Sequence, residues 1–177
     1  MKGYTAQDYI KKLGLEPHKE GGYFKNTFHS SSYLSKESLP GAFNGERKLY
    51  TSIYFLLTSN DVSHFHRLKS DELWYFHAGS PLVIHIIDEE GNYIEKKLGL
   101  DLDNGEEPQV LVPKNCIFGS SVAAKDSFSL VGCMVAPGFA YEDFELFTQK
   151  ELLDKYPQHE EIIVKLAYEK LPQAENR

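Results

Sequence analysis

Residues 63–79 read SHFHRLKSDELWYFHAG, and no other stretch of the chain says as much about its structure. On a β-strand, side chains two positions apart point to the same face, so we predict that His64 and His66 share one face. By the same alternation, Glu72 and Trp74 share one face of the strand that follows. A hairpin that packs these two faces together brings two imidazoles and one carboxylate to a single site.

Two histidines and one carboxylate serve two kinds of chemistry. They are a common ligand set for Fe(II), Mn(II), Ni(II) or Zn(II), and they are equally a set for general acid–base catalysis. An isolated HxH pair also occurs on ordinary solvated strands, but the apolar and aromatic residues at positions 73–76 favour a packed strand. The residues by themselves leave these alternatives open.

Short strands flank this stretch on both sides. Turns rich in Gly, Asn, Asp and Pro separate them, and we predict strands at about 23–29, 50–58, 63–67, 72–77, 82–88, 93–98, 109–113, 117–124 and 127–136. The apolar run at 53–57 indicates a strand buried on both faces, and residues 30–46 are predicted to be a long loop. Many short strands separated by turns are typical of an antiparallel sandwich or barrel.

Helices are predicted only near the two ends. Thr5 is a candidate N-cap, and Gly14 is a candidate C-terminal stop for a short first helix. Thr148 and Glu151 form a capping-box pattern ahead of a second short helix. Apolar residues at helical spacing predict a further helix from Pro157 to about residue 170.

The composition limits the class of protein. A chain of 177 residues fits a single domain, which we place at 1–177, with a barrel at about 20–147 and a helical tail at about 148–171. The net charge of −7 argues against nucleic acid or an anionic membrane as partner. No apolar run approaches the roughly 18 residues of a membrane span, and the N-terminus lacks a signal peptide, so we expect a cytoplasmic protein. Cys116 and Cys133 are too few for a disulfide framework.

The HxH stretch resembles the first motif of the cupin superfamily, in which HxH is followed by a Glu and, after six residues, by a Gly. Glu72 and Gly79 match this half of the motif, and the gap from His66 to Glu72 is one residue longer than in the motif. The second cupin motif would fall on Pro113 to Phe118, where Phe118 stands in place of the fourth ligand, a His. The resemblance implies a mainly β fold, the double-stranded β-helix or jelly-roll barrel, here with a short N-terminal helix and C-terminal helices.

Further segments resemble one branch of this superfamily, whose activity is not established. They are Pro17–Phe24, Ile53–Leu57, Leu130–Phe139 and Asp143–Leu146. With the HxH stretch they run in order over about residues 4–165, which is almost the whole chain. This resemblance implies the cupin fold and leaves the activity open.

The same branch is similar in shape to the 3,5-epimerases that act on a dTDP-linked 4-keto-6-deoxy sugar. Their motif RGxFxExF would lie on residues 21–28, where one Gly and two Phe match. Carried over by position, His64 stands where the epimerases have their catalytic base, and His66 stands where they have Gln. Their catalytic Tyr has no counterpart at 134–137, and Tyr141 lies shortly after.

We therefore expect a pocket for a small, sugar-like molecule inside the barrel. The candidate catalytic residues are His64 and Glu72, and the candidate ligand-binding residues are Tyr54, His66, Trp74, Gly22 and Tyr23. One interpretation is an isomerase or epimerase acting on a carbohydrate or sugar nucleotide, with His64 as general base. The alternative is a cupin that binds a small ligand, or a weakly held divalent metal, without turnover.

Cofactor and assembly follow from the same resemblance. We expect no obligatory cofactor; if a divalent metal binds, its ligands are His64, His66 and Glu72, and Phe118 makes the binding weak. The resembled families imply a homodimer joined through β-sheet, with residues 23–29 as the candidate contact.

Three other positions have plausible structural roles. His85 lies in an apolar strand and is expected to be a histidine with satisfied hydrogen bonds, and Cys133 is expected to be an inert buried thiol. His18 belongs to a Gly-containing loop that is equally compatible with a structural turn and with a ligand-binding loop.

Overall fold

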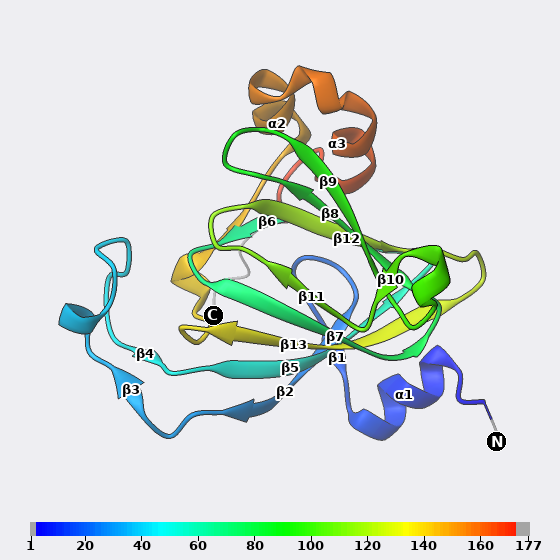
Figure 1. Ribbon diagram of the computed structural model, residues 1–177, viewed down its shortest axis with the longest axis horizontal. Helices are drawn as coiled ribbons and strands as arrows, with labels where there is room; N and C mark the ends of the chain where they lie inside the picture. The colour runs from blue at the N-terminus through cyan, green and yellow to red at the C-terminus, as the bar shows by residue number, and fades with distance from the viewer. Residues whose placement is uncertain (1–2, 173–177) are drawn as a thin grey trace.

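The computed structural model describes residues 3–172, so residues 1–2 and 173–177 of the predicted domain lie outside the described residues. Two six-stranded sheets face each other and form a barrel (Figure 1). The first sheet has the strand order β1 (Glu16–Pro17), β2 (Tyr23–His29), β5 (Thr51–Thr58), β13 (Phe128–Ala136), β7 (Asp71–Gly79) and β11 (Gln109–Val112). The second has the order β10 (Glu106–Glu107), β9 (Tyr93–Leu98), β8 (Leu82–Ile87), β12 (Ile117–Val122), β6 (Val62–Leu68) and β14 (Phe144–Leu146).

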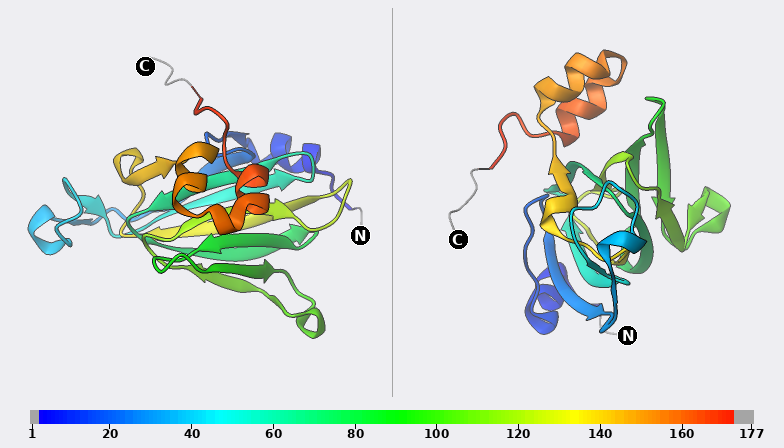
Figure 2. Two further views of the ribbon diagram at one scale, coloured as in Figure 1. Left: turned by 90° about the horizontal axis from the view of Figure 1, so that it is seen from above. Right: turned by 90° about the vertical axis from the view of Figure 1, so that its left-hand side faces the viewer.

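This architecture confirms the predicted jelly-roll barrel with flanking helices. Neighbouring strands of the two sheets pair antiparallel, except β10 with β9. The predicted loop at 30–46 and the residues just after it form an arm that projects from the barrel (Figure 2). The arm contains β3 (Tyr33–Leu34), a 3₁₀ turn at Lys36–Ser38 and β4 (Arg47–Lys48). Arg47 ties the arm to the barrel through a buried ion pair with Asp143, at 2.6 Å from Nε to Oδ2.

The helices begin at the predicted caps. Thr5 and Asp8 form a capping box before α1 (Ala6–Leu13), and Gly14 ends this helix in the left-handed conformation, with φ 66°. A second capping box precedes α2 (Gln149–Lys155). The last predicted helix is shorter than expected: a 3₁₀ turn at Pro157–His159 leads into α3 (Glu160–Leu166), and the chain is extended from residue 167.

Three hydrophobic clusters hold these layers together. The largest lies between the two sheets and includes Phe55 and Trp74. A second lies between the outer face of the second sheet and α2 and α3, and a third lies between the first sheet and α1. Strand β5 belongs to two clusters, because Phe55 faces the barrel interior and Leu56 faces α1. Burial on both faces is confirmed for residues 55–57, whereas Ile53 and Tyr54 are half-buried.

Strand β6 contains an irregularity that matters for the site. His66 pairs with Phe118 of β12, and Ser63 pairs with Ser120, so three residue steps in β6 lie opposite two steps in β12. This is a β-bulge, in which one extra residue interrupts the strict alternation of side chains.

Two further 3₁₀ turns complete the described chain, at Leu102–Asn104 and Tyr141–Asp143. In residues 3–172, no helix combines the length and the apolar character that crossing a membrane requires.

Candidate functional site

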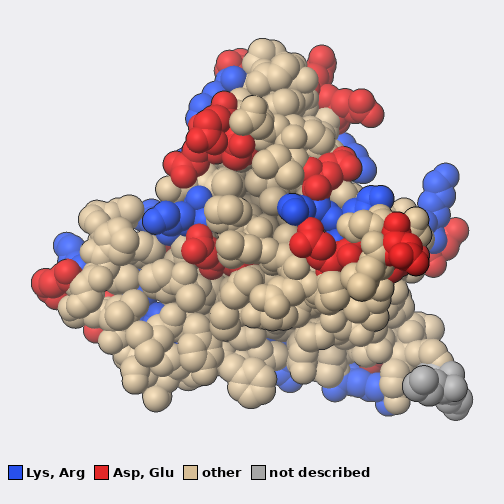
Figure 3. Space-filling view, in the orientation of Figure 1, with Lys and Arg blue, Asp and Glu red and all other residues tan. Residues whose placement is uncertain are grey.

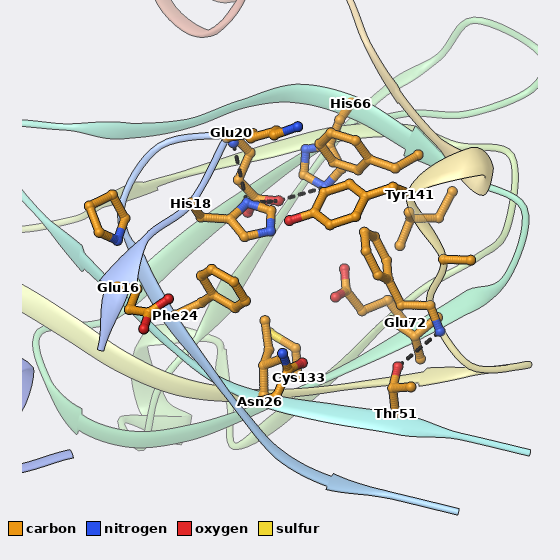
Figure 4. A pocket seen from close by; sticks show the side chains of 18 residues that line it. Glu16, His18, Glu20, Phe24, Asn26, Thr51, His66, Glu72, Cys133 and Tyr141 are labelled. Carbon is orange, nitrogen blue, oxygen red and sulfur yellow. Dashed lines mark hydrogen bonds and ion pairs between the residues drawn. The ribbon is translucent and has the colours of Figure 1, made fainter. Parts of the chain in front are cut away.

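A cavity of about 510 Å³ opens into the barrel between the two sheets (Figure 4). One wall is the chain at 16–20, at and after β1. The second is formed by interior side chains of β2, β5, β6, β7 and β13, and the third is the segment 139–144, which runs into β14. The volume is in the range of pockets that hold one small molecule.

Glu72 projects into this cavity from β7. Its side chain is buried, and its Oε2 accepts a hydrogen bond from the indole Nε1 of Trp74 at 3.1 Å. Burial raises the pKa of the Glu72 carboxyl well above its usual range, and the nearby Glu20 carboxylate raises it further. This shift favours the protonated form of Glu72, which can donate a hydrogen bond or a proton.

A cluster of polar side chains around Glu20 forms the other side of the cavity (Figure 4). The Oε2 of Glu20 lies 3.3 Å from Nδ1 of His18 and 3.4 Å from Nε2 of His66. Its other oxygen, Oε1, accepts a hydrogen bond from the hydroxyl of Ser63 at 2.7 Å. Glu20 is itself buried, and the Ser63 hydroxyl supplies a hydrogen bond in place of water that a carboxylate would otherwise bind.

The hydrogen bonds of His66 fix the orientation of its ring. Its Nδ1 lies 2.7 Å from the carbonyl oxygen of His64, and because a carbonyl only accepts, Nδ1 carries a proton. The second ring nitrogen, Nε2, is thereby left for proton exchange beside Glu20. The ring is thus held with Nε2 directed toward Glu20.

His18 lies in the cavity wall, and its hydrogen bonding differs from that of His66. The backbone N–H of Glu20 donates to its Nδ1 at 3.2 Å, and its ring packs edge-on against Phe24, with ring centroids 4.7 Å apart. Burial lowers the pKa of His18, and the Glu20 carboxylate opposes this shift. The loop that was compatible with both a structural turn and a ligand loop therefore supplies His18 and Glu20 to the cavity.

Aromatic side chains form the mouth of the cavity. Phe139, Tyr141 and Phe144 pack edge to face, with ring centroids 5.1–6.3 Å apart. The Tyr141 side chain points across the opening toward His18 and Glu20 (Figure 4), and the ammonium of Lys19 lies 4.9 Å from the centre of its ring. Tyr141, noted in the sequence only for its position after residue 137, thus lies at the site.

His64 does not line the cavity, which corrects the prediction that it shares a face with His66. Its ring stacks on Tyr168, with centroids 3.6 Å apart and planes 9° apart, and its Nδ1 donates to the carbonyl of Glu20 at 2.8 Å. The physical reason is the bulge in β6. The extra residue directs Ser63 and His66 toward the Glu20 carboxylate and turns the His64 ring away from the cavity.

The remaining predicted residues divide in the same way. His66 and Glu72 line the cavity as predicted, whereas Tyr54, Trp74, Gly22 and Tyr23 do not. Trp74 faces the interior with Glu72 but is enclosed in the core, and Tyr54 and Tyr23 pack on the α1 side of the first sheet. Side chains alternate along β2, so Tyr23 faces away from the cavity and the next residue, Phe24, faces it.

The predicted metal ligands, His64, His66 and Glu72, also need correction. Cupin-fold proteins can hold a metal between histidines and a carboxylate, but with His64 outside the cavity the three predicted ligands do not come together. Within residues 3–172, no three His, Cys, Asp or Glu side chains are grouped as a metal site requires. The three predicted ligands therefore do not form a metal site, and we derive no chemistry through one.

Two minor predictions are confirmed. His85 is buried and both ring nitrogens have partners, the Tyr93 hydroxyl at 2.6 Å and the Ser121 hydroxyl at 3.0 Å. Burial lowers the pKa of His85 to about 4, so it is neutral. Cys133 is a buried free thiol at the cavity wall, and burial together with the carboxyls of Glu72 and Glu20 raises its pKa well above the usual range.

Two facing six-stranded sheets, antiparallel except for β10 with β9, around an internal cavity with polar side chains are typical of a cupin barrel. The chain belongs to the family described as Cupin superfamily (DUF985), whose model matches residues 7–147. A solved structure of a Shewanella oneidensis protein is similar, with 50% identity and a TM-score of 0.86 over 95% of this chain and 100% of that one. A hypothetical protein from Leishmania major has 44% identity and a TM-score of 0.85 over 94% of this chain and 100% of that one.

More distant relatives agree on the fold. An uncharacterised protein of Saccharomyces cerevisiae is 29% identical over 148 residues, which cover 78% of this chain and 73% of the relative. An oxalate decarboxylase structure from Bacillus subtilis has 16% identity and a TM-score of 0.52 over 90% of this chain and 41% of that one. This last likeness shows the barrel alone.

Proposed function

We propose that this protein is an isomerase or epimerase that moves a proton on a small hydroxylated carbonyl compound, such as a keto sugar or a sugar nucleotide, bound in the cavity. One observation carries the proposal. A buried carboxyl, Glu72, whose pKa is raised well above its usual range, faces the same cavity as Glu20, which contacts two imidazoles. Paired titratable groups with different protonation states are what acid–base catalysis requires.

Glu72 is the proposed general acid. A protonated carboxyl in a dry site donates a strong hydrogen bond to the carbonyl oxygen of the substrate, and it stabilises the negative charge that forms there when a neighbouring C–H proton leaves. The Trp74 indole holds one oxygen of Glu72, so the carboxyl is oriented before the substrate binds.

His66 is the proposed general base, in place of His64. Its Nε2 takes the proton from the carbon next to the carbonyl, and the Glu20 carboxylate stabilises the imidazolium that results. The resulting enol gives an epimer when water delivers a proton to the opposite face of the carbon while Glu72 takes back the proton on oxygen. It gives an isomer when His66 returns its proton to the former carbonyl carbon while the neighbouring hydroxyl gives its proton to Glu72. No metal or other cofactor is needed for this step.

The walls of the cavity suit a sugar-like ring. Asn26, Thr51 and Tyr141 offer amide and hydroxyl groups near the mouth, and Phe24, Phe139 and Phe144 offer flat apolar surfaces. This combination of a few polar groups with aromatic faces is typical of sites that bind small polar molecules.

The proposal is tested by incubating the protein in D₂O with a panel of keto sugars and sugar nucleotides. Proton NMR then measures the loss of the signal next to each carbonyl. We expect deuterium to enter with at least one class of compound. Glu72→Gln and His66→Asn are expected to lower the exchange rate by about 10²–10⁴-fold, the usual contribution of a positioned acid or base.

His77→Asn is the matched control. His77 lies on the outer face of the first sheet, against Tyr54, and is expected to leave the rate unchanged. Failure of the whole panel to exchange, while a compound of the panel binds by calorimetry, would contradict the enzyme proposal. It would support the alternative of a cupin that binds a small ligand without turnover.

A further inference from the structure

The loop at 18–22 is the cavity wall that carries His18 and Glu20, and residues distant in sequence hold it from behind. Gly21 lies so close to β6 that a Cβ there would stand 2.1 Å from the carbonyl oxygen of Val62. The N–H of Gly22 donates to the carboxylate of Asp61 at 2.9 Å. The position of the loop is therefore set mainly by what it packs against.

Tyr168, which follows α3, supplies one of these outside contacts. Its hydroxyl donates to the carbonyl oxygen of Lys19 at 2.9 Å, across 149 positions of sequence. Tyr168 is itself held in place, because its carbonyl accepts the N–H of Gln149 at 2.8 Å and it forms a parallel bridge with Thr148.

His64 supplies the other contact. Its backbone N–H and its ring Nδ1 both donate to the carbonyl oxygen of Glu20, at 2.6 Å and 2.8 Å. Its ring lies flat against Tyr168, so the two side chains form one stacked unit. The carbonyls of two successive loop residues, Lys19 and Glu20, are thus fixed by two stacked rings.

We infer that Tyr168 and His64 form a latch that positions the Glu20 carboxylate against His66, so that the segment after α3 controls the geometry of the cavity. Both are positioning residues, since neither lines the cavity. They set the distances from Glu20 to His18 and to His66, which are 3.3 Å and 3.4 Å. A shift of about 1 Å at such contacts can change a rate by about 10²-fold. The inference rests on the proposed function only in assigning Glu20 a part in the reaction.

Hydrogen exchange of the backbone amides at 20–22 tests the latch. Tyr168→Phe keeps the stacked ring and removes only the hydrogen bond to Lys19, and we expect these amides to exchange about 2- to 10-fold faster. Tyr168→Ala also removes the stack and is expected to have a larger effect. Glu169→Ala changes the exposed neighbouring residue and is the matched control, with no effect at 20–22.

A second measurement separates positioning from general loss of stability. The Glu20 carboxylate raises the pKa of His18 against the lowering effects of burial, His66 and Lys19. If the latch positions Glu20, the pKa of His18 measured by ¹⁵N NMR falls in Tyr168→Ala, in the same direction as in Glu20→Gln. Tyr168→Phe is expected to give an intermediate value.

Unchanged exchange at 20–22 in Tyr168→Ala, or a His18 titration identical to that of the wild type, would overturn the latch. Neither measurement needs a substrate, so the latch can fail while deuterium exchange into a sugar succeeds, and the reverse is also possible. If a substrate is identified, Tyr168→Ala is expected to lower kcat about 10-fold or more relative to Glu169→Ala.

Discussion

Glu72 shows how one buried group affects both chemistry and stability. Burial penalises the charged form of its carboxyl, and the nearby Glu20 adds to this effect, so the pKa of Glu72 is raised well above its usual range. In the unfolded chain the same carboxyl has its ordinary pKa of about 4.3 and is ionised at neutral pH. Folding therefore favours proton uptake by Glu72 at pH values between its unfolded and its folded pKa.

The pH dependence of stability follows from this difference. Between the unfolded and the folded pKa of Glu72, the native state binds more protons than the unfolded state. The contribution of Glu72 to stability is therefore fully present below its unfolded pKa and is lost as pH rises toward its folded pKa, with a limiting slope of about 1.4 kcal/mol per pH unit. We predict that Glu72→Gln, which stays neutral, unfolds in urea with a smaller loss of stability between pH 5 and pH 8 than the wild type.

The exposed Glu145→Gln is the control for this comparison, because Glu145 pairs with Arg67 at the surface, where such pairs contribute little. Parallel pH profiles for the wild type and Glu72→Gln would show that Glu72 is not the buried neutral acid described here.

At the scale of elements, the loop at 18–22 depends on a glycine. Gly21 has φ 106°, a conformation that side chains with a Cβ rarely adopt, and the carbonyl of Val62 fills the space where a Cβ would stand. We predict that Gly21→Ala lowers the free energy of unfolding by about 1–3 kcal/mol and accelerates amide exchange at 20–22. Thermal unfolding and hydrogen exchange measure both effects.

Gly41→Ala is the control, since nothing lies within 4 Å of a Cβ at Gly41 and its backbone is not left-handed. Equal stability of the two variants would mean that the loop moves away from β6 without cost.

The same elements show what could be predicted from sequence. Strand positions, the capping residues Thr5 and Thr148, and the interior orientation of Glu72 follow from local patterns. The direction of His64 does not, because the bulge in β6 arises from pairing with β12, and alternation along one strand gives no sign of it. Glu20 and Tyr141 were not predicted as site residues for a related reason. Each reaches the cavity from an irregular segment that long-range contacts hold in place.

At the scale of the whole molecule, β2 leaves part of a sheet edge uncovered. In the described chain β1 pairs only with Tyr23 and Phe24, so residues 25–29 have no partner on the side away from β5. Phe28 is 69% exposed on this strand, and the visible surface over β2, β5 and β13 carries few charged side chains (Figure 3). Uncovered edges of this kind invite pairing with another strand.

We propose, as the sequence also led us to expect, a homodimer formed through β2. We predict that light scattering finds a dimer at micromolar concentration and that Phe28→Lys shifts it toward the monomer with little change in melting temperature. Leu102→Lys is the control, because Leu102 is equally exposed, at 69%, but lies in a distant 3₁₀ turn. A wild-type monomer, or equal effects of the two variants, would contradict the assignment of this edge.

Trp74 gives the molecule an internal optical reporter. It is the single tryptophan in the chain, and it is 2% exposed. Its indole N–H donates a hydrogen bond to the carboxyl of Glu72, which lines the cavity. Its fluorescence therefore comes from one environment, and quenching by a nearby carboxyl depends on whether that carboxyl is ionised. A compound that displaces cavity water or draws the proton from Glu72 alters the emission directly, so unlabelled protein can be screened against a chemical library with intrinsic fluorescence alone.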